Sequence, residues 1–397
     1  MMGVLTMRQA ALALLVLVLV PAARADDGGI APETRWNHAR GPASNSGMSH
    51  AEPPESFGRF AWTYRAKGAI AFPPVVWDGA AFVVDGKDLV ALDVATGQVW
   101  ARAAATAPGQ PVAFAGSAFL VEEGKRLVEF RLAGRKLVRE WACDAGEGLS
   151  CPRILEGEIY ATTPAALLGL RVGMQTPAWK VEGAFTGEPA VRDGHVYALR
   201  RDGTNLVLAA FARTDGAEAA SAIVSDKAEG PGGRVVIGRD IAGVLLLPEE
   251  ARTWALLSRK LDGDRLSLEV ARTEKLLTEP LAGMYTLLAV TEEPRQWCFL
   301  TLNPKEQRRP LVTQKDRPDL FEAVVPCVWL GESSQCFGAW CGDPFGNTIL
   351  WHLNERPEGA QLRKGLRFHA VPARAGRLLL VPADGKSVVA LAPEEIK

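Results

Sequence analysis

From Phe60 onward, the chain consists of short apolar runs separated by turn signals. Runs such as "PVVW", "AAFVVD" and "LVALD" are four to six residues long and rich in Val, Leu and aromatic residues, and Asp-Gly or Thr-Gly pairs stand between them. Such runs are typical of β-strands, and Asp-Gly is a strong signal for a tight hairpin turn. The pattern therefore predicts an all-β protein built from antiparallel hairpins.

The hairpin pattern repeats with a period of about 40 residues. A glycine, an aromatic residue and two leucines return at a constant offset of 78 residues, which spans two periods. These positions are Gly79, Phe82, Leu89, Leu92 and Gly157, Tyr160, Leu167, Leu170. An intermediate copy runs from Gly116 to Trp141, and a further copy from Arg192 to Gly216. A single four-stranded copy cannot bury both of its faces, so we expect the copies to pack around an axis as the blades of a β-propeller.

The number of copies predicts eight blades. Copies open near six prolines, Pro74, Pro111, Pro152, Pro189, Pro326 and Pro372. The 137 residues from Pro189 to Pro326 leave room for two degenerate copies, around residues 234–261 and 284–303. Seven blades is the alternative, because these middle copies lack the Thr-Gly turn.

The last copy is incomplete, and the start of the chain holds an unassigned strand. "DGKSVVALAPEEIK" ends at Lys397 after three strands, whereas "RFAWTYRA" (Arg59–Ala66) precedes the first complete copy. Pairing this strand into the last blade would close the ring and remove two free sheet edges. In the alternative, Trp62 packs in an irregular leader. We expect four tryptophans to pack between blades as structural residues: Trp62, Trp100, Trp141 and Trp179.

The first residues have the pattern of an export signal. Arg8 precedes an uninterrupted apolar run from Ala10 to Val20, and Ala23-Arg24-Ala25 offers small residues for cleavage after Ala25. The run of 11 residues is shorter than the roughly 20 that a membrane-spanning helix needs, so a permanent anchor is the less favoured alternative. We expect a signal peptide (1–25), an irregular leader or clasp (26–58) and one propeller domain (59–397). His38 and His50 lie in the leader and are expected to be exposed.

Composition and charge exclude some partners. The chain is 48% hydrophobic and 23% charged, which is ordinary for a soluble globular protein. Its 45 Lys and Arg residues against 46 Asp and Glu residues give no basic excess, and removal of the signal peptide (1–25), with its two arginines and no acids, leaves 43 against 46. Nucleic acid is therefore not an expected partner. We expect an exported protein, periplasmic or secreted, without a transmembrane segment in its mature form.

Export makes the six cysteines candidates for disulfides. A two-residue turn at Gly331-Glu332 in "CVWLGESSQC" would place Cys327 opposite Cys336. Cys336 with Cys341 and Cys143 with Cys151 are further candidate pairs, and spacing alone does not choose among them. A zinc site at Cys336, Cys341 and His352 lacks a fourth ligand.

Two segments carry a resemblance to a known family. "DGAAFVVDGKDLVALDVATGQVW" (78–100) resembles the repeat of the pyrroloquinoline-quinone-like (PQQ-like) β-propellers, and "WNHARGP" (36–42) is similar to the W-x-x-x-R-G-P start of exported bacterial members. The resemblance implies a propeller fold. The family includes both quinone-dependent alcohol dehydrogenases and non-enzymatic scaffolds, so it does not by itself imply an activity.

The chemistry of those dehydrogenases is not visible in this sequence. By resemblance, an enzyme would need a calcium site, an Asp base, a flat Trp and a vicinal Cys-Cys disulfide, and no two cysteines here are adjacent. Neither G-x-S-x-G nor H-E-x-x-H occurs. We therefore expect no catalytic or metal site and no cofactor, and a binding scaffold in the cell envelope for a protein, peptide or glycan. The alternative is a PQQ- and calcium-dependent dehydrogenase or a cofactor-binding sensor.

Overall fold

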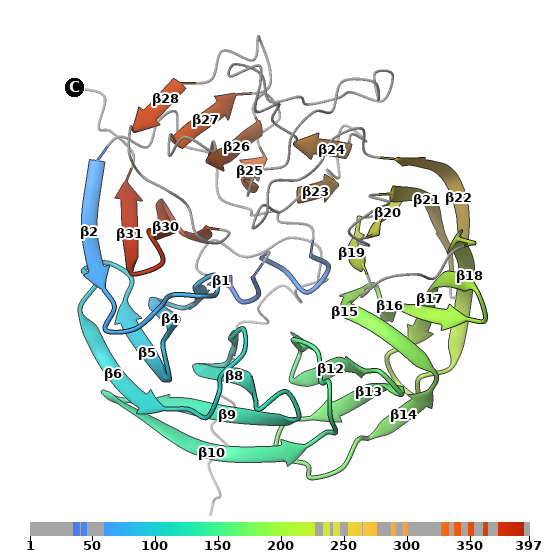
Figure 1. The fold of residues 1–397 in the computed structure, drawn as a ribbon, viewed down its shortest axis with the longest axis horizontal. Coiled ribbons are helices and arrows are strands. Elements are labelled where there is room, and N and C mark those ends of the chain that lie inside the picture. The colour runs from blue at the N-terminus through green and yellow to red at the C-terminus, as the bar shows by residue number, and fades with distance from the viewer. Residues whose placement is uncertain are drawn as a thin grey trace, which may run out of the picture.

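The computed structural model describes residues 35–39, 41–45, 59–226, 233–238, 241–246, 253–263, 265–275, 287–290, 297–300, 327–332, 337–342, 348–352, 360–363 and 372–392. Within these ranges the regular secondary structure is all β. Figure 1 shows the sheets standing around a central axis as a β-propeller, which confirms the predicted fold. None of the described residues forms a helix that could cross a membrane.

The first three blades each have four antiparallel strands that follow one another from the axis outward. They comprise β3 (Val75–Trp77), β4 (Ala80–Asp85), β5 (Asp88–Asp93), β6 (Val99–Ala104); β7 (Val112–Phe114), β8 (Ser117–Glu122), β9 (Arg126–Ala133), β10 (Lys136–Asp144); and β11 (Arg153–Leu155), β12 (Glu158–Thr163), β13 (Ala166–Arg171), β14 (Trp179–Glu182). Their inner strands begin directly after Pro74, Pro111 and Pro152, as the repeat predicts.

The fourth and fifth blades are joined at their inner strands. The strands are β15 (Ala184–Arg192), β16 (His195–Asp202), β17 (Asn205–Ala212), β18 (Glu218–Ser225) and β19 (Gly233–Ile237), β20 (Ile241–Leu246), β21 (Thr253–Asp262), β22 (Arg265–Lys275). A parallel pairing of Glu188 in β15 with Arg234 in β19 connects the two blades into one sheet. The first degenerate copy therefore forms a complete blade.

The remaining strands bring the count to eight. The second degenerate copy contributes β23 (Leu287–Val290) and β24 (Trp297–Leu300), and the seventh blade has β25 (Cys327–Glu332), β26 (Phe337–Gly342), β27 (Thr348–His352) and β28 (Ala360–Arg363). The eighth holds β29 (Ala373–Ala375), β30 (Leu378–Ala383) and β31 (Ser387–Ala392). The described strands thus occupy eight successive positions in chain order.

The Asp-Gly pairs explain why the inner hairpins are so tight. Asp78 and Gly79 between β3 and β4 have φ values of 41° and 89°, and Asp193 and Gly194 between β15 and β16 have 47° and 75°. Two consecutive positive φ values define the type I′ turn, whose twist matches that of the flanking strands. The turn residues therefore fix the register within each blade.

The N-terminal strand closes the ring, as predicted. Strand β2 (Arg59–Arg65) pairs antiparallel with β31 and completes the eighth blade in the order β2-β31-β30-β29. Figure 1 shows this blue strand beside the red one. A register shift between Phe60 and Trp62 marks a β-bulge. The alternative of an irregular segment at Trp62 is wrong.

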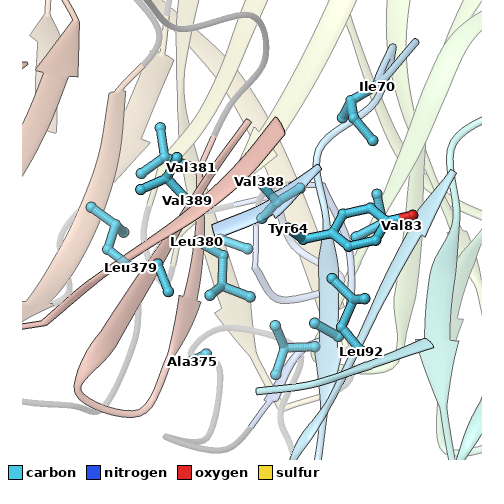
Figure 2. Close-up of a cluster of buried hydrophobic side chains, with 14 of the residues drawn as sticks. Tyr64, Ile70, Val83, Leu92, Ala375, Leu379, Leu380, Val381, Val388 and Val389 are labelled. Carbon is cyan, nitrogen blue, oxygen red and sulfur yellow. The ribbon is translucent and has the colours of Figure 1, made fainter. Parts of the chain in front are cut away.

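Each described core cluster lies between two neighbouring blades, so the inner and middle strands are buried on both faces. Figure 2 shows the cluster between the eighth and first blades, in which Tyr64 from β2 packs with Leu380 and Val389 on one side and Val83 and Leu92 on the other. Burying each large apolar side chain contributes about 1.5–3 kcal/mol. Because β2 supplies part of this cluster, the stability of the first blade depends on closure.

Candidate functional site

The N-terminal residues 35–39 and 41–45, called the channel segment below, run along the inner strands near the axis of the propeller. Strand β1 (Arg35–Trp36) pairs with β3, with Trp36 opposite Val76. The carbonyl of Asn37 then accepts a hydrogen bond from the Ala113 N–H in β7 at 2.8 Å. Figure 1 shows β1 inside the ring. The segment therefore contacts the first two blades within three residues.

The channel segment continues across the next three blades. His38 Nε2 accepts from the Ile154 N–H at 2.9 Å, and the carbonyls of Ala43 and Ser44 accept from Val191 and Ile237, each at 2.9 Å. Asn45 Nδ2 donates to the carbonyl of Val235 at 2.9 Å. Inner-strand N–H groups of five successive blades are thus paired with one short stretch of chain. An inner edge with unpaired N–H groups would need water or a ligand instead.

His38 is buried, which corrects the expectation of an exposed loop residue. Its exposed fraction is 0%, and its Nδ1 lies 3.3 Å from the carbonyl of Gly41. Because Nε2 accepts from Ile154, the ring proton of the neutral imidazole belongs on Nδ1, where it is donated to Gly41. Burial lowers the pKa of His38 well below its ordinary value, and the positive charge of Arg153 lowers it further. His50 lies outside the described residues.

The "WNHARGP" motif forms a tight turn around the Trp36 side chain. His38 and Gly41 exchange two backbone hydrogen bonds of 3.1 Å. Gly41 has a φ of 76°, and a Cβ at this position would lie 3.0 Å from the indole ring of Trp36. Only glycine satisfies both constraints without a shift of the ring. The motif therefore shapes a buried segment.

Charged groups next to the channel segment are used in structural contacts. The guanidinium of Arg153, which is fully buried, donates to Glu188 Oε2 at 2.6 Å and to the carbonyl of Pro189 at 3.2 Å. Burial and the nearby Glu188 raise the pKa of Cys151 to about 12. A thiol that is protonated at neutral pH is a poor nucleophile, and a neutral His38 with both nitrogens engaged is a poor general base. These residues do not form a nucleophile–base pair.

The polar atoms of the channel segment do not form a calcium or quinone cradle. Trp36 Nε1, Asn37 Oδ1 and Asn45 Oδ1 are buried without a hydrogen-bond partner among the described residues. They carry no charge, whereas calcium selects carboxylate-rich oxygen shells. Across the described part of the chain, no three His, Cys, Asp or Glu side chains are grouped to hold a metal ion. The described residues therefore do not fit the calcium site that the PQQ-like family implies.

The repeated tryptophans lie between blades. The indole N–H groups of Trp62, Trp141 and Trp179 donate to the carbonyls of Val94 (2.8 Å), Met174 (3.1 Å) and Arg213 (2.8 Å). Each acceptor belongs to the blade that follows. Trp100 is half-buried against the core between the first two blades. All four positions occupy inter-blade packing sites.

Charged side chains line a shallow hollow beside Trp179. The guanidinium of Arg213 donates to the hydroxyl of Tyr160 at 3.0 Å and to Glu158 and Glu156 at 3.0 and 3.1 Å, and the Tyr160 hydroxyl donates to Glu158. Burial and the Glu158 carboxylate raise the pKa of Tyr160. Because the charges compensate one another, the hollow links the third and fourth blades and offers no free ionic group to a ligand. Sequence inspection did not single out this group, because its members lie in separate repeats.

The described cysteines differ from the predicted pairings. Cys143 and Cys151 are free thiols, with Cys143 Sγ 3.2 Å from the carbonyl of Gln175 and Cys151 Sγ 3.9 Å from that of Gln110. Cys143 ends an outer strand and Cys151 precedes an inner one, so the pair considered from the sequence is not formed. The register of β25 and β26 places Cys327 opposite Cys341 instead of Cys336, which lies outside the described residues. Disulfides of these three cysteines stay a prediction.

Comparisons with known proteins identify the fold. No protein-family model matches the chain, and the curated proteins give no match. The computationally designed Ika8 protein matches with a TM-score of 0.55 at 10% identity, over 85% of this chain and 100% of the designed one. Quinohemoprotein alcohol dehydrogenase from Comamonas testosteroni matches with a TM-score of 0.59 at 11% identity, over 91% and 81% of the two chains. BamB from Moraxella catarrhalis matches at 12% identity with a TM-score of 0.44, over 84% and 99%. At such identities the first two likenesses show a shared fold and leave function to the residues of the site.

Proposed function

We propose that the protein is an exported, non-enzymatic binding scaffold of the cell envelope, whose propeller presents its loops to an envelope or extracellular protein, peptide or glycan. The observation that carries the proposal is the channel segment. A ligand at the axis of the propeller would need the inner-strand N–H groups or the space beside them, and the channel segment already pairs with five blades there. Binding is then left to the loops on the two faces of the ring, which vary in sequence on a rigid support.

Export is part of the proposal and rests on the signal-peptide pattern alone. The n-region, the apolar run and the cleavage site at residues 1–25 support it. Neutral His38 and protonated Cys151 support the absence of catalysis in the described part of the channel, because neither group is poised for proton transfer or nucleophilic attack. The alternative is a quinone-dependent dehydrogenase, a function that Comamonas testosteroni quinohemoprotein alcohol dehydrogenase performs on the same fold.

One pair of measurements separates scaffold from enzyme. The purified mature protein is mixed with pyrroloquinoline quinone and calcium, and quinone absorbance and dye reduction with alcohols and sugars are recorded. We expect neither stoichiometric quinone binding nor substrate-dependent dye reduction. Both together would replace the scaffold proposal with an oxidoreductase.

A second experiment asks which face binds. A photo-crosslinking amino acid is placed at Lys87 or Thr204, in turns between the second and third strands of two blades, and at Asp78 or Arg135, in turns at the opposite ends of the strands. All four residues are exposed. We expect discrete adducts in envelope fractions from one pair of positions and none from the other. Absence of adducts at all four positions would count against a face-bound partner.

A further inference from the structure

The seam where the N-terminal strand closes the ring brings three backbone segments together. The Ala66 N–H donates to the carbonyl of Lys386 at 2.9 Å, and the Ile70 N–H to that of Gly385 at 2.7 Å. On the other side, the Gly86 N–H donates to the carbonyl of Ala69 at 3.0 Å. The loop after β2 therefore lies between the turn that joins β30 to β31 and the turn that joins β4 to β5.

Four exposed cations stand on these three segments. They are Arg65 and Lys67 from β2 and its loop, Lys87 from the turn in the first blade and Lys386 from the turn in the eighth, and they are called the seam face below. None of the four has an ion-pair partner among the described residues, whereas Arg102, Arg139 and Arg213, for example, each contact a carboxylate within 3.0 Å. The seam face is thus a group of four exposed positive charges that no described carboxylate pairs.

Two of the three acidic residues beside the seam face already form ion pairs or hydrogen bonds with other groups. The side chain of Asp85 is fully buried and accepts hydrogen bonds from the Tyr64 hydroxyl (2.6 Å), the Gly68 N–H (2.6 Å) and the Arg102 guanidinium (2.9 Å). Asp88 is paired with Arg102 at 2.7 Å. Asp384 is the one exposed acid in the turns described above. In these turns, the four cations therefore lie near only one exposed carboxylate, that of Asp384, which has no ion pair among the described residues.

The loop that carries Lys67 is held rigidly. Besides its contacts with both neighbouring turns, its Lys67 and Gly68 N–H groups both donate to the buried Asp85 carboxylate, at 3.1 and 2.6 Å. A Cβ on Gly68 would lie 2.7 Å from the Cα of Gly86, so the two backbones touch. The buried cluster beneath the loop, shown in Figure 2, includes Tyr64 and Ile70. The backbone that carries Lys67 is therefore held in place, and binding would not need to order the loop.

We propose that the seam face binds the surface of a lipid bilayer that contains anionic headgroups. Three of its four cations are lysines, which act as mobile point charges and lack the planar fork with which arginine grips a single phosphate. They are spread over two blades and a loop, and the intervening Ala69 and Ala71 are exposed small residues. This arrangement favours a distributed array of negative charges such as a leaflet rich in anionic lipid. The inference goes beyond the scaffold function and does not depend on a protein partner.

The test is co-sedimentation of the purified mature protein with vesicles of phosphatidylcholine alone or with about one third phosphatidylglycerol, at low and at physiological salt. Each cation at an anionic surface strengthens binding about five-fold. The wild type should bind only the anionic vesicles, more weakly at high salt, and the Lys67→Gln/Lys87→Gln/Lys386→Gln protein should bind about 100-fold more weakly.

A matched control keeps the same change in net charge. Arg135→Gln/Lys136→Gln/Arg377→Gln removes three exposed cations without ion pairs among the described residues, two from turns at the opposite ends of the strands and one from the first residue of β10. This control should bind like the wild type, and all three proteins should melt at the same temperature. Equal weakening in the control, or no binding of the wild type to anionic vesicles, would overturn the proposal. Binding of soluble polyglutamate without binding to vesicles would also overturn it and would indicate an acidic polypeptide partner.

Discussion

Replacing His38 with glutamine tests whether the channel segment is held by a neutral imidazole. In the folded protein, His38 accepts a hydrogen bond from Ile154 and lies against the carbonyl of Gly41. A glutamine amide also offers one acceptor and a donor, but it does not titrate. The substitution therefore preserves the polar pairing and removes the dependence on protonation.

The magnitude follows from the direction of the pKa shift. Burial and the charge of Arg153 keep the folded-state pKa of His38 well below 6.5, so that the unfolded state binds the proton first as the pH falls. Stability from this group is therefore fully present above the unfolded value and declines below it, by about 1.4 kcal/mol per pH unit until the folded-state pKa is reached. Between about pH 7 and about pH 5.5 the wild type should lose about 1.2 kcal/mol more than His38→Gln.

The assay is urea unfolding of both proteins, followed by tryptophan fluorescence, at several pH values across that range. Only the difference between the two proteins is interpreted, because other groups titrate equally in both. A difference that grows as the pH falls supports a buried neutral His38. Parallel pH profiles would refute the assignment of His38 to the buried side of the channel segment.

Three further predictions concern the seam, the closure and the half-buried Cys151 thiol. In chemical denaturation, Gly97→Ala should lower the free energy of unfolding by about 1–3 kcal/mol more than Gly79→Ala, because a Cβ at Gly97 would lie 2.5 Å from the Trp62 ring, whereas Gly79 has a similar positive φ and open space. Equal losses would show that Gly97 and Trp62 are not tightly packed at the seam. A protein that lacks residues 26–66 should melt at a lower temperature or aggregate in size-exclusion chromatography, because it loses both β2 and the channel segment; melting like the mature form would argue against closure by these residues. Cys151, with a pKa raised to about 12, should resist iodoacetamide in the folded protein and react after unfolding, as followed by mass spectrometry; rapid labelling of the folded protein would contradict the raised pKa.

The repeat structure could be predicted because each blade is specified locally. Alternating apolar runs and Asp-Gly turns set the strands and their register within about 40 residues, so the copies were visible as a period in the sequence. The broken last copy and the orphan strand around Trp62 also predicted the pairing of β2 with β31, which the structure confirms. The pairing could be predicted without knowing any contact, because the last repeat lacks one strand and the segment around Trp62 is an unassigned strand of the same type.

The candidate site could not be predicted in this way. The channel segment has no periodicity of its own, and its partners are distant in sequence: His38 contacts Ile154, 116 residues away, and Asn45 contacts Val235, 190 residues away. The one available signal was the "WNHARGP" motif, which lies in the stretch predicted to be an irregular leader or clasp with His38 exposed. The surroundings of these residues exist only after several blades have assembled around an axis.

The sequence by itself thus determined the strands, the eight repeats and the way in which the ring closes, because hairpin geometry and hydrophobic alternation act between near neighbours. Only the tertiary structure decided that residues 36–38 and 41–45 lie buried at the axis and that Arg65, Lys67, Lys87 and Lys386 share one surface. Each of these depends on segments that are far apart in the chain. Their proximity is set by the closed ring, and no local pattern of residues encodes it.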